Sequence, residues 1–235
     1  MNRTPDDIQK AIQATRTKIA DFQQQYPDAA PEVTLLAVSK TKPVELIRAA
    51  MQAGQQDFGE NYLDEALLKI ETIGRDACTW HFIGQIQSNK TAAIAAGFDW
   101  VHGIDRQKIA KRLAAQRPDS LPPLNCCIQL NIDSEDTKAG VQPGELPDLC
   151  AQIAELPQLK LRGLMCIPAP RTELNEQRAL FHQVTTALND LQTRYPQLDT
   201  LSMGMSGDLE AAIAEGSTLV RIGTALFGAR PPKPA

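Results

Sequence analysis

Eight segments of strand type alternate with segments of helical type along this chain, and that alternation restricts its fold more than any other feature. Apolar runs predict strands over residues 33–39, 57–60, 80–84, 99–102, 124–132, 159–167, 200–203 and 218–222. Amphipathic segments predict helices over residues 43–53, 62–73, 88–96, 105–116, 143–155, 173–194 and 207–215. Such alternation indicates a parallel α/β sheet. Eight strands close a (β/α)8 barrel of TIM type, which typically takes ~250 residues, close to the 235 residues here. An open, doubly wound sheet is the alternative.

The chain is expected to form one domain with a helix added at its N-terminus. Residues 4–26 have amphipathic periodicity, with Thr4 as the N-cap and Pro5 in the first turn, where its missing N–H costs nothing. No linker rich in Pro, Gly or Ser divides the sequence. We therefore expect one barrel domain over residues 1–230, with the N-terminal helix (within residues 1–28) packed on it. The Pro-rich tail 231–235 cannot continue a helix.

Composition excludes several classes of protein. The formal net charge is −4, and no run of Lys or Arg offers a face for nucleic acid. No apolar stretch reaches membrane-spanning length, and the N-terminus lacks the apolar core of a signal peptide. The five cysteines and three histidines have neither disulfide nor metal-ligand spacing. We expect a cytoplasmic, monomeric protein with no bound metal.

A lysine ends the first predicted strand. Because side chains alternate between the two faces of a strand, Lys40 points the same way as Val38 and Leu36. An amine at the mouth of an apolar strand is partly desolvated, and desolvation lowers its pKa and makes it nucleophilic, as in Schiff-base lysines. A solvated lysine that simply closes the strand is the alternative interpretation.

Two later turns have the composition of a phosphate site. Ser202-Met203-Gly204-Met205-Ser206-Gly207-Asp208 leads into a helix, and Arg221-Ile222-Gly223-Thr224 follows the last strand. Backbone N–H groups at the start of a helix, with hydroxyls beside them, bind anions. Barrels commonly bind phosphate in the loops after strands seven and eight. An ordinary capped turn remains the alternative for the first of the two.

A strand-end lysine opposite two phosphate turns suits pyridoxal 5′-phosphate (PLP), a phosphorylated aldehyde that forms an imine with lysine. Arg221 can only donate hydrogen bonds, so at the pyridine nitrogen it would keep that nitrogen unprotonated and the ring a weak electron sink. Arg221 in a surface ion pair is the alternative. A Schiff-base aldolase acting on a sugar phosphate would use the same lysine and turns, but it has no evident need for Arg221.

Several motifs together resemble the pyridoxal phosphate homeostasis protein family, whose barrel is similar to the N-terminal domain of alanine racemase. They are Ala37-Val38-Ser39-Lys40-Thr41-Lys42-Pro43, Phe58-Gly59-Glu60-Asn61-Tyr62, Trp80-His81-Phe82-Ile83-Gly84, Gly163-Leu164-Met165 and the two turns above. The resemblance runs from about Val33 to Arg230 and implies a (β/α)8 barrel.

The resemblance also implies the residues around the cofactor. PLP would be held as a Schiff base on Lys40, with Arg221 at the pyridine nitrogen. The phosphate would lie on Ser206, Gly207, Gly223 and Thr224. Asn61 and Met203 would line the ring, and His81 would lie near it.

Two functions compatible with PLP are left by the sequence. One is intracellular PLP homeostasis, with PLP-dependent apoenzymes as possible acceptors. The other is an amino-acid racemase or a related PLP enzyme. Racemisation needs an acid/base on each face of the cofactor. Lys40 serves one face, and the only candidates for the other are Tyr62 and His81, which lies on the barrel's own rim with no lid above it. The cofactor would then stay open to water, so we expect no significant turnover.

Overall fold

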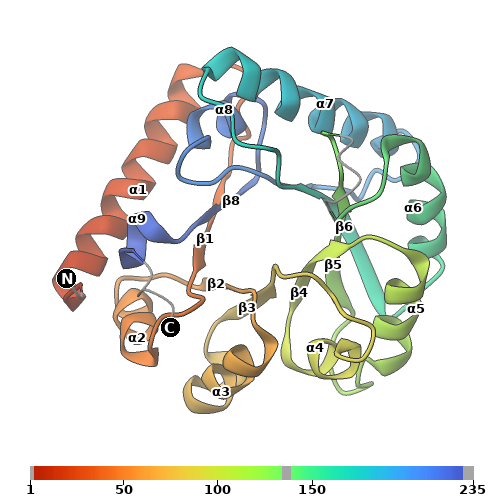
Figure 1. The fold of residues 1–235 in the computed structure, drawn as a ribbon, viewed down its shortest axis with the longest axis horizontal. Coiled ribbons are helices and arrows are strands. Elements are labelled where there is room, and N and C mark those ends of the chain that lie inside the picture. The colour runs from red at the N-terminus through yellow and green to blue at the C-terminus, as the bar shows by residue number, and fades with distance from the viewer. Residues whose placement is uncertain (1–2, 134–138, 230–235) are drawn as a thin grey trace, which may run out of the picture.

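The strands of the described chain pair side by side in sequence order and close on themselves (Figure 1). The structure is a computed structural model that describes residues 3–133 and 139–229. Its strands are β1 (Thr34–Val38), β2 (Asp57–Glu60), β3 (Thr79–Phe82), β4 (Trp100–Ile104), β5 (Leu124–Leu130), β6 (Leu159–Cys166), β7 (Thr200–Ser202) and β8 (Leu219–Ile222). All neighbouring pairs are parallel. The predicted (β/α)8 barrel is confirmed.

Helices surround the strands and connect each one to the next (Figure 1). They are α1 (Pro5–Gln25), α2 (Val44–Gln52), α3 (Leu63–Ile73), α4 (Thr91–Gly97), α5 (Gln107–Gln116), α6 (Leu146–Ala154), α7 (Leu174–Gln192), α8 (Leu209–Ala214) and α9 (Thr224–Phe227). Two 3-10 turns, η1 (Arg75–Ala77) and η2 (Pro143–Glu145), precede β3 and α6.

The pairing of β1 with β8 closes the barrel. Four residue pairs form this seam, among them Leu36 with Arg221 and Ala37 with Ile222. An open sheet would leave β1 and β8 apart, so this pairing excludes the open alternative. It also brings the carboxyl ends of the first and last strands together.

Strand alternation separates an outer apolar core from the barrel interior. Leu35 and Ala37 belong to the large cluster between strands and helices, whereas Leu36 contacts Ile83 and Leu219 in a second cluster. Burial of the outer cluster stabilises the barrel, because each fully buried aliphatic side chain contributes about 1.5–3 kcal/mol.

The N-terminal helix begins as expected. The backbone N–H of Asp7 donates to Thr4 Oγ1 and that of Thr4 donates to the Asp7 carboxylate, which is a capping box. Helix α1 packs against α2, α8 and α9, and it buries Ile8, Ile12 and Ile19. The predicted tail 231–235 lies outside the described residues.

Two element boundaries differ from expectation in ways that matter for the site. Pro43 is the N-cap of α2 rather than its first residue, because its extended backbone (ψ 159°) precedes the helix. Strand β4 continues to Ile104, two residues beyond the expected end. His102 therefore lies in the middle of a strand.

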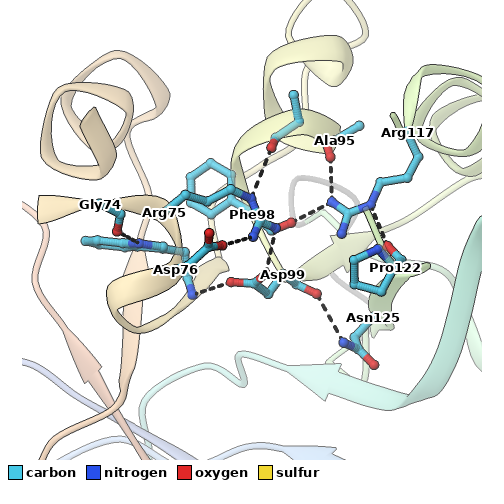
Figure 2. Close-up of polar contacts among 11 residues, drawn as sticks. Gly74, Arg75, Asp76, Ala95, Phe98, Asp99, Arg117, Pro122 and Asn125 are labelled. Carbon is cyan, nitrogen blue, oxygen red and sulfur yellow. Dashed lines mark hydrogen bonds and ion pairs between the residues drawn. The ribbon is translucent and has the colours of Figure 1, made fainter. Parts of the chain in front are cut away.

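Polar contacts fix the loops at the amino ends of β3 to β5 (Figure 2). The Asp99 carboxylate accepts from the backbone N–H of Trp80 and pairs with Arg75 at 2.7 Å. Buried Arg117 donates to the carbonyl of Phe98 at 2.7 Å and to two further carbonyls. Burial lowers the pKa of Arg117, and its three carbonyl acceptors compensate for the lost water.

The cysteines are reduced and buried in the described chain, and burial raises the pKa of Cys78 to about 12. None of the helices that the structure describes is both long and apolar enough to cross a bilayer. Within residues 3–133 and 139–229, no group of three or more His, Cys, Asp or Glu is arranged to hold a metal ion.

Gly163 in β6 is expected to tolerate no side chain, because a Cβ there would overlap the carbonyl oxygen of Thr200 in β7. Gly163→Ala should lower the free energy of unfolding by about 1–3 kcal/mol or more. Gly144→Ala, where a Cβ meets nothing within 4 Å, is the control and should change it by less than about 0.5 kcal/mol. Equal denaturant midpoints for the two variants would contradict the β6–β7 packing.

Candidate functional site

A cavity of about 290 Å³ opens at the carboxyl ends of the barrel strands. Its lining comprises Val38, Lys40, Lys42, Asn61, Ile83, Ile167, Met205, Ser206, Gly207, Arg221, Gly223, Thr224 and Gly228. Three of these side chains are cations, and none of the described lining residues is acidic. In a chain of net charge −4, this local excess of positive charge favours an anionic ligand.

Lys40 lies in the turn directly after β1 and is partly buried. The backbone N–H of Ser39 still pairs with Gly59 of β2, so the strand register extends to the residue before Lys40. Lys42, two residues on, donates to the carbonyls of Gly228 and Ala229 at 2.9 and 2.8 Å. The two lysines therefore differ in role, because Lys42 fastens the segment after α9 to the mouth of the barrel.

The backbone after Lys40 adopts a rare conformation. Thr41 has φ 62°, the left-handed region that a β-branched residue seldom enters. Its N–H donates to Glu65 Oε1 of α3 at 2.7 Å. Its Oγ1 is buried without a hydrogen-bond partner in the described chain. Such strain persists only where surrounding contacts enforce it, and it often marks functional turns.

Buried Lys69 of α3 holds the turn from the other side. Its Nζ donates to the carbonyl of Ser39 at 2.8 Å and pairs with Glu60 at 2.7 Å and Glu65 at 2.5 Å. Burial raises the pKa of Glu60, while Lys69 and the Ser39 hydroxyl act in the opposite direction. The residues before and after Lys40 are thus both fixed to α3, which restricts where the Lys40 side chain can begin.

The turn after β7 presents backbone donors to the cavity. The Asp208 carboxylate accepts from the N–H of Met205 at 2.5 Å and closes the turn. The N–H groups of Ser206 and Gly207 make no hydrogen bond within the described chain. The N–H of Arg221 donates to the carbonyl of Gly204, so this turn and β8 are held together.

Arg221 is buried beneath the cavity. Its Nη1 donates to Ser202 O and Ser202 Oγ at 2.6 and 2.9 Å, and its Nη2 donates to Cys166 O at 2.8 Å. Burial lowers the pKa of the guanidinium, which nevertheless stays charged. Two of its five N–H groups have no partner in the described chain. It is therefore the interior cation of the site and not a surface ion pair.

Sequence comparison identifies the relatives of this barrel. The family model of the alanine racemase N-terminal domain matches residues 12–231. The pyridoxal phosphate homeostasis protein of Escherichia coli K12 is 53% identical over 96% of this chain and 97% of its own. That of Pseudomonas aeruginosa PAO1 is 58% identical over 84% of this chain and 85% of its own. The chain belongs to the pyridoxal phosphate homeostasis protein family.

Solved structures agree with this family. PipY of Synechococcus elongatus, solved with PLP bound, shares 37% identity over 94% of this chain and 100% of its own, with a TM-score of 0.81. Alanine racemase of Corynebacterium glutamicum has 18% identity over 98% of this chain and 62% of its own, with a TM-score of 0.67. At that identity it shares the fold alone.

Seven of the nine residues that the homeostasis-family resemblance implied lie together. They line the one cavity, and they are Lys40, Asn61, Ser206, Gly207, Arg221, Gly223 and Thr224. Asn61 follows β2, and its Oδ1 is buried without a partner in the described chain.

The structure places His81 and Met203 elsewhere. His81 is opposite Trp100, the first residue of β4, so it lies toward the amino ends of the strands and bonds to Asp57 and His102. Met203 is fully buried in the outer core. Because Ser202 contacts Arg221 in the interior, alternation turns Met203 outward. Met205 lines the cavity instead.

Sequence reasoning missed the residues that support Lys40. Lys69 and Glu65 come from a helix some 25 residues away, and nothing in their spacing indicated contact with the lysine turn. The i, i+4 spacing of Glu65 and Lys69 was a visible signal for their ion pair alone. Lys42 lies two residues after Lys40, so strand alternation could have assigned its side chain to the same end of the barrel.

Lys69→Met should destabilise the protein by about 3–5 kcal/mol, because it leaves the buried Glu60 carboxylate without its cation. Glu60 would then bind a proton more tightly in the folded than in the unfolded chain, so the loss should be smaller at pH 5 than at pH 8. Denaturant titrations at both values measure it.

Lys90→Met is the matched control, since it breaks the exposed ion pair with Asp64 and should cost less than about 1 kcal/mol. A similar cost for the two variants, or a Lys69→Met deficit independent of pH, would contradict the buried network.

Proposed function

We propose that this protein binds PLP in the cavity at the barrel mouth and takes part in intracellular PLP homeostasis. The observation that carries the proposal is the cavity lining, which combines Lys40, Lys42 and Arg221 with hydroxyl and backbone N–H donors and no described carboxylate. PLP is a small anion with one aldehyde, one phosphate and one ring nitrogen. The names of the relatives and the PLP-bound PipY structure support the same ligand.

The residues present fit this cofactor. Asn61 offers a buried Oδ1 that lacks a partner in the described chain, as expected of an atom reserved for a ligand. Gly207 has nothing within 4 Å of a Cβ position, and its N–H makes no hydrogen bond within the described chain, so it can donate to a phosphate. A Cβ on Gly223 would stand 3.2 Å from Val38 O, so a side chain there would require β1 or this turn to shift by a few tenths of an ångström.

Each lining residue then has a role toward the cofactor. Ser206, Gly207, Gly223 and Thr224 would hold the phosphate through hydroxyl and backbone donors. Arg221 would offer one of its remaining N–H groups to the pyridine nitrogen. Because arginine does not release its proton, that nitrogen would stay unprotonated.

The Lys40 amine would hold PLP as a reversible Schiff base, with release of water, through the aldehyde that the bound cofactor would supply. Lys40 is proposed for this bond, as the family resemblance implies. The Lys42 ammonium donates to the backbone carbonyls of Gly228 and Ala229. A reversible bond in a cavity open to solvent suits uptake and release of the cofactor.

We propose that the protein has no significant turnover. Racemisation needs a second acid/base on the face opposite Lys40. His81, one candidate, is bonded to Asp57 and His102 away from the cavity, and Tyr62 is 50% exposed and does not line it. Of the described lining residues, only the two lysines could exchange a proton near neutral pH, since Arg221 remains charged.

The remaining parts of the proposal concern the cell. PLP-dependent apoenzymes are the natural acceptors of a reversibly held cofactor, and we propose a cytoplasmic location, which the bacterial relatives support. The single chain already contributes all the residues assigned above, so we propose a monomer.

Borohydride reduction of PLP-loaded protein, followed by peptide mapping, should place the pyridoxyl group on Lys40. Lys40→Ala should abolish the adduct and the associated visible absorbance, whereas Lys42→Ala should keep both. An adduct mainly on Lys42 or Lys90 would refute the assignment. Absence of any adduct in the wild-type protein would leave a Schiff-base aldolase acting on a sugar phosphate as the better hypothesis.

PLP-loaded protein incubated with either enantiomer of alanine in D2O should show α-deuterium exchange and racemisation far below ordinary enzyme rates. Chiral chromatography and mass spectrometry measure the two processes. Turnover of about 1 per second or faster would favour the racemase over homeostasis.

A further inference from the structure

A line of polar side chains crosses the barrel interior beneath the cavity. Ser202 Oγ, which accepts from Arg221 Nη1, lies 2.8 Å from His102 Nδ1. His102 Nε2 lies 3.0 Å from His81 Nδ1. His81 Nε2 in turn lies 3.1 Å from Asp57 Oδ1. Four consecutive hydrogen bonds thus join a guanidinium to a carboxylate.

The line connects two cavities at opposite ends of the barrel. Arg221 lines the cavity at the carboxyl ends of the strands. Asp57 and His81 line another at the amino ends, together with Trp100, Arg162 and Asp199. The links between them are shut away from water, since Ser202 and His102 have no exposed surface.

The two ends of the line fix the direction of every hydrogen bond in it. Arg221 can only donate, and both N–H groups of its Nη1 go to Ser202. The Ser202 hydroxyl, having accepted, can donate its own proton to His102 Nδ1. His102 then carries its proton on Nε2 and donates to His81.

The same direction continues to the far end. His81 accepts at Nδ1, carries its proton on Nε2 and donates to Asp57, whose ionised carboxylate can only accept. Both histidines are neutral in this arrangement, and every member is satisfied. Burial lowers the pKa of His102, and the charges of His81 and Arg221 act in the same direction, which agrees with a neutral imidazole.

We propose that Ser202, His102, His81 and Asp57 are positioning residues that form a one-directional hydrogen-bonded chain through the barrel and orient Arg221 toward the cofactor. The part of this inference that concerns the cofactor rests on the proposed function. The existence of the hydrogen-bonded chain does not rest on it, because all four of its members are residues of this protein.

A buried cation needs such an arrangement. Arg221 forms no ion pair within the described chain, and an isolated buried charge is strongly disfavoured. Hydrogen bonds in a row polarise one another in a low dielectric, so the chain directs the negative ends of neutral dipoles toward the guanidinium. Two N–H groups of Arg221 are left for the cavity.

The charged surroundings of His81 come from several strands. Asp57 of β2 bonds to it, His102 of β4 faces it, and Trp100 stacks on it with ring centroids 5.4 Å apart. The Arg162 guanidinium of β6 lies over the Trp100 ring, 4.7 Å from its centre, and pairs with Asp199. The charged groups around His81 are therefore the carboxylates of Asp57 and Asp199 and the guanidinium of Arg162.

Histidine ¹⁵N NMR on the full-length protein without added PLP tests the chain directly. The sequence has three histidines, and exposed His182 serves as the reference. At pH 7, His81 and His102 should both show a protonated Nε2 and an unprotonated Nδ1. His102 protonated at Nδ1, or a doubly protonated His81 or His102, would overturn the proposal.

Ser202→Ala removes the donor to His102 Nδ1 and should shift the His102 nitrogen resonances toward a mixture of tautomers. Ser217→Ala is the matched control, because the buried Ser217 hydroxyl contacts only backbone carbonyls and no member of the hydrogen-bonded chain. Asp57→Asn keeps an oxygen acceptor for His81 and should preserve both tautomers. Unchanged His102 resonances in Ser202→Ala would overturn the chain.

The effect on the cofactor is measured by PLP titration and absorbance. Ser202→Ala should bind PLP about tenfold more weakly than wild type, with a displaced absorption maximum, whereas Ser217→Ala should match wild type. Equal affinity and spectrum in Ser202→Ala would overturn the positioning role. If wild-type protein takes up no PLP, the proposed function fails. The tautomers of His81 and His102 measured by NMR still test whether the hydrogen-bonded chain exists.

Discussion

The pairing of β1 with β8 is the constraint on which the site depends. It sets Leu36 opposite Arg221 and Ala37 opposite Ile222, so the turn after β1 and the turn after β8 must emerge side by side. A lysine and a Gly-Thr turn that are more than 180 residues apart in sequence thereby share one cavity. Without this seam, the cations and the backbone donors would belong to separate loops.

Polar groups are buried on both sides of β1, and each set has a different task. On the helix side, Lys69 binds Ser39, Glu60 and Glu65 and so fixes the turn that carries Lys40. In the interior, the hydrogen-bonded chain from Arg221 to Asp57 occupies space that bulky apolar side chains usually fill, beside the cluster of Leu36, Ile83 and Leu219. Buried polar networks seldom add stability over an apolar core. Their benefit here is orientation, since one set fixes the turn that carries Lys40 and the other holds Arg221, and both of these residues line the cavity.

Much of this could be predicted from the sequence, and for a physical reason. Eight alternating strands and helices favour a closed barrel. Alternation within β1 predicted that Lys40 points toward the mouth of the barrel, where it lines the cavity. His81 lies away from the cavity because neighbouring strands of a barrel are staggered, so a residue near the end of β3 lies level with the start of β4. Met203 follows inward-facing Ser202 and therefore points outward, which strand parity could have indicated. The Lys69 network was invisible because it depends on how α3 packs beneath the β1 turn.

A crystal structure of the protein grown with PLP tests the assignment of Lys40 and Arg221 most directly. We expect density continuous between Lys40 Nζ and the cofactor, and the ring nitrogen beside Arg221. We also expect the phosphate between the Ser206-Gly207 and Gly223-Thr224 turns. A phosphate bound at another loop, or a cofactor joined to Lys42, would contradict this assignment.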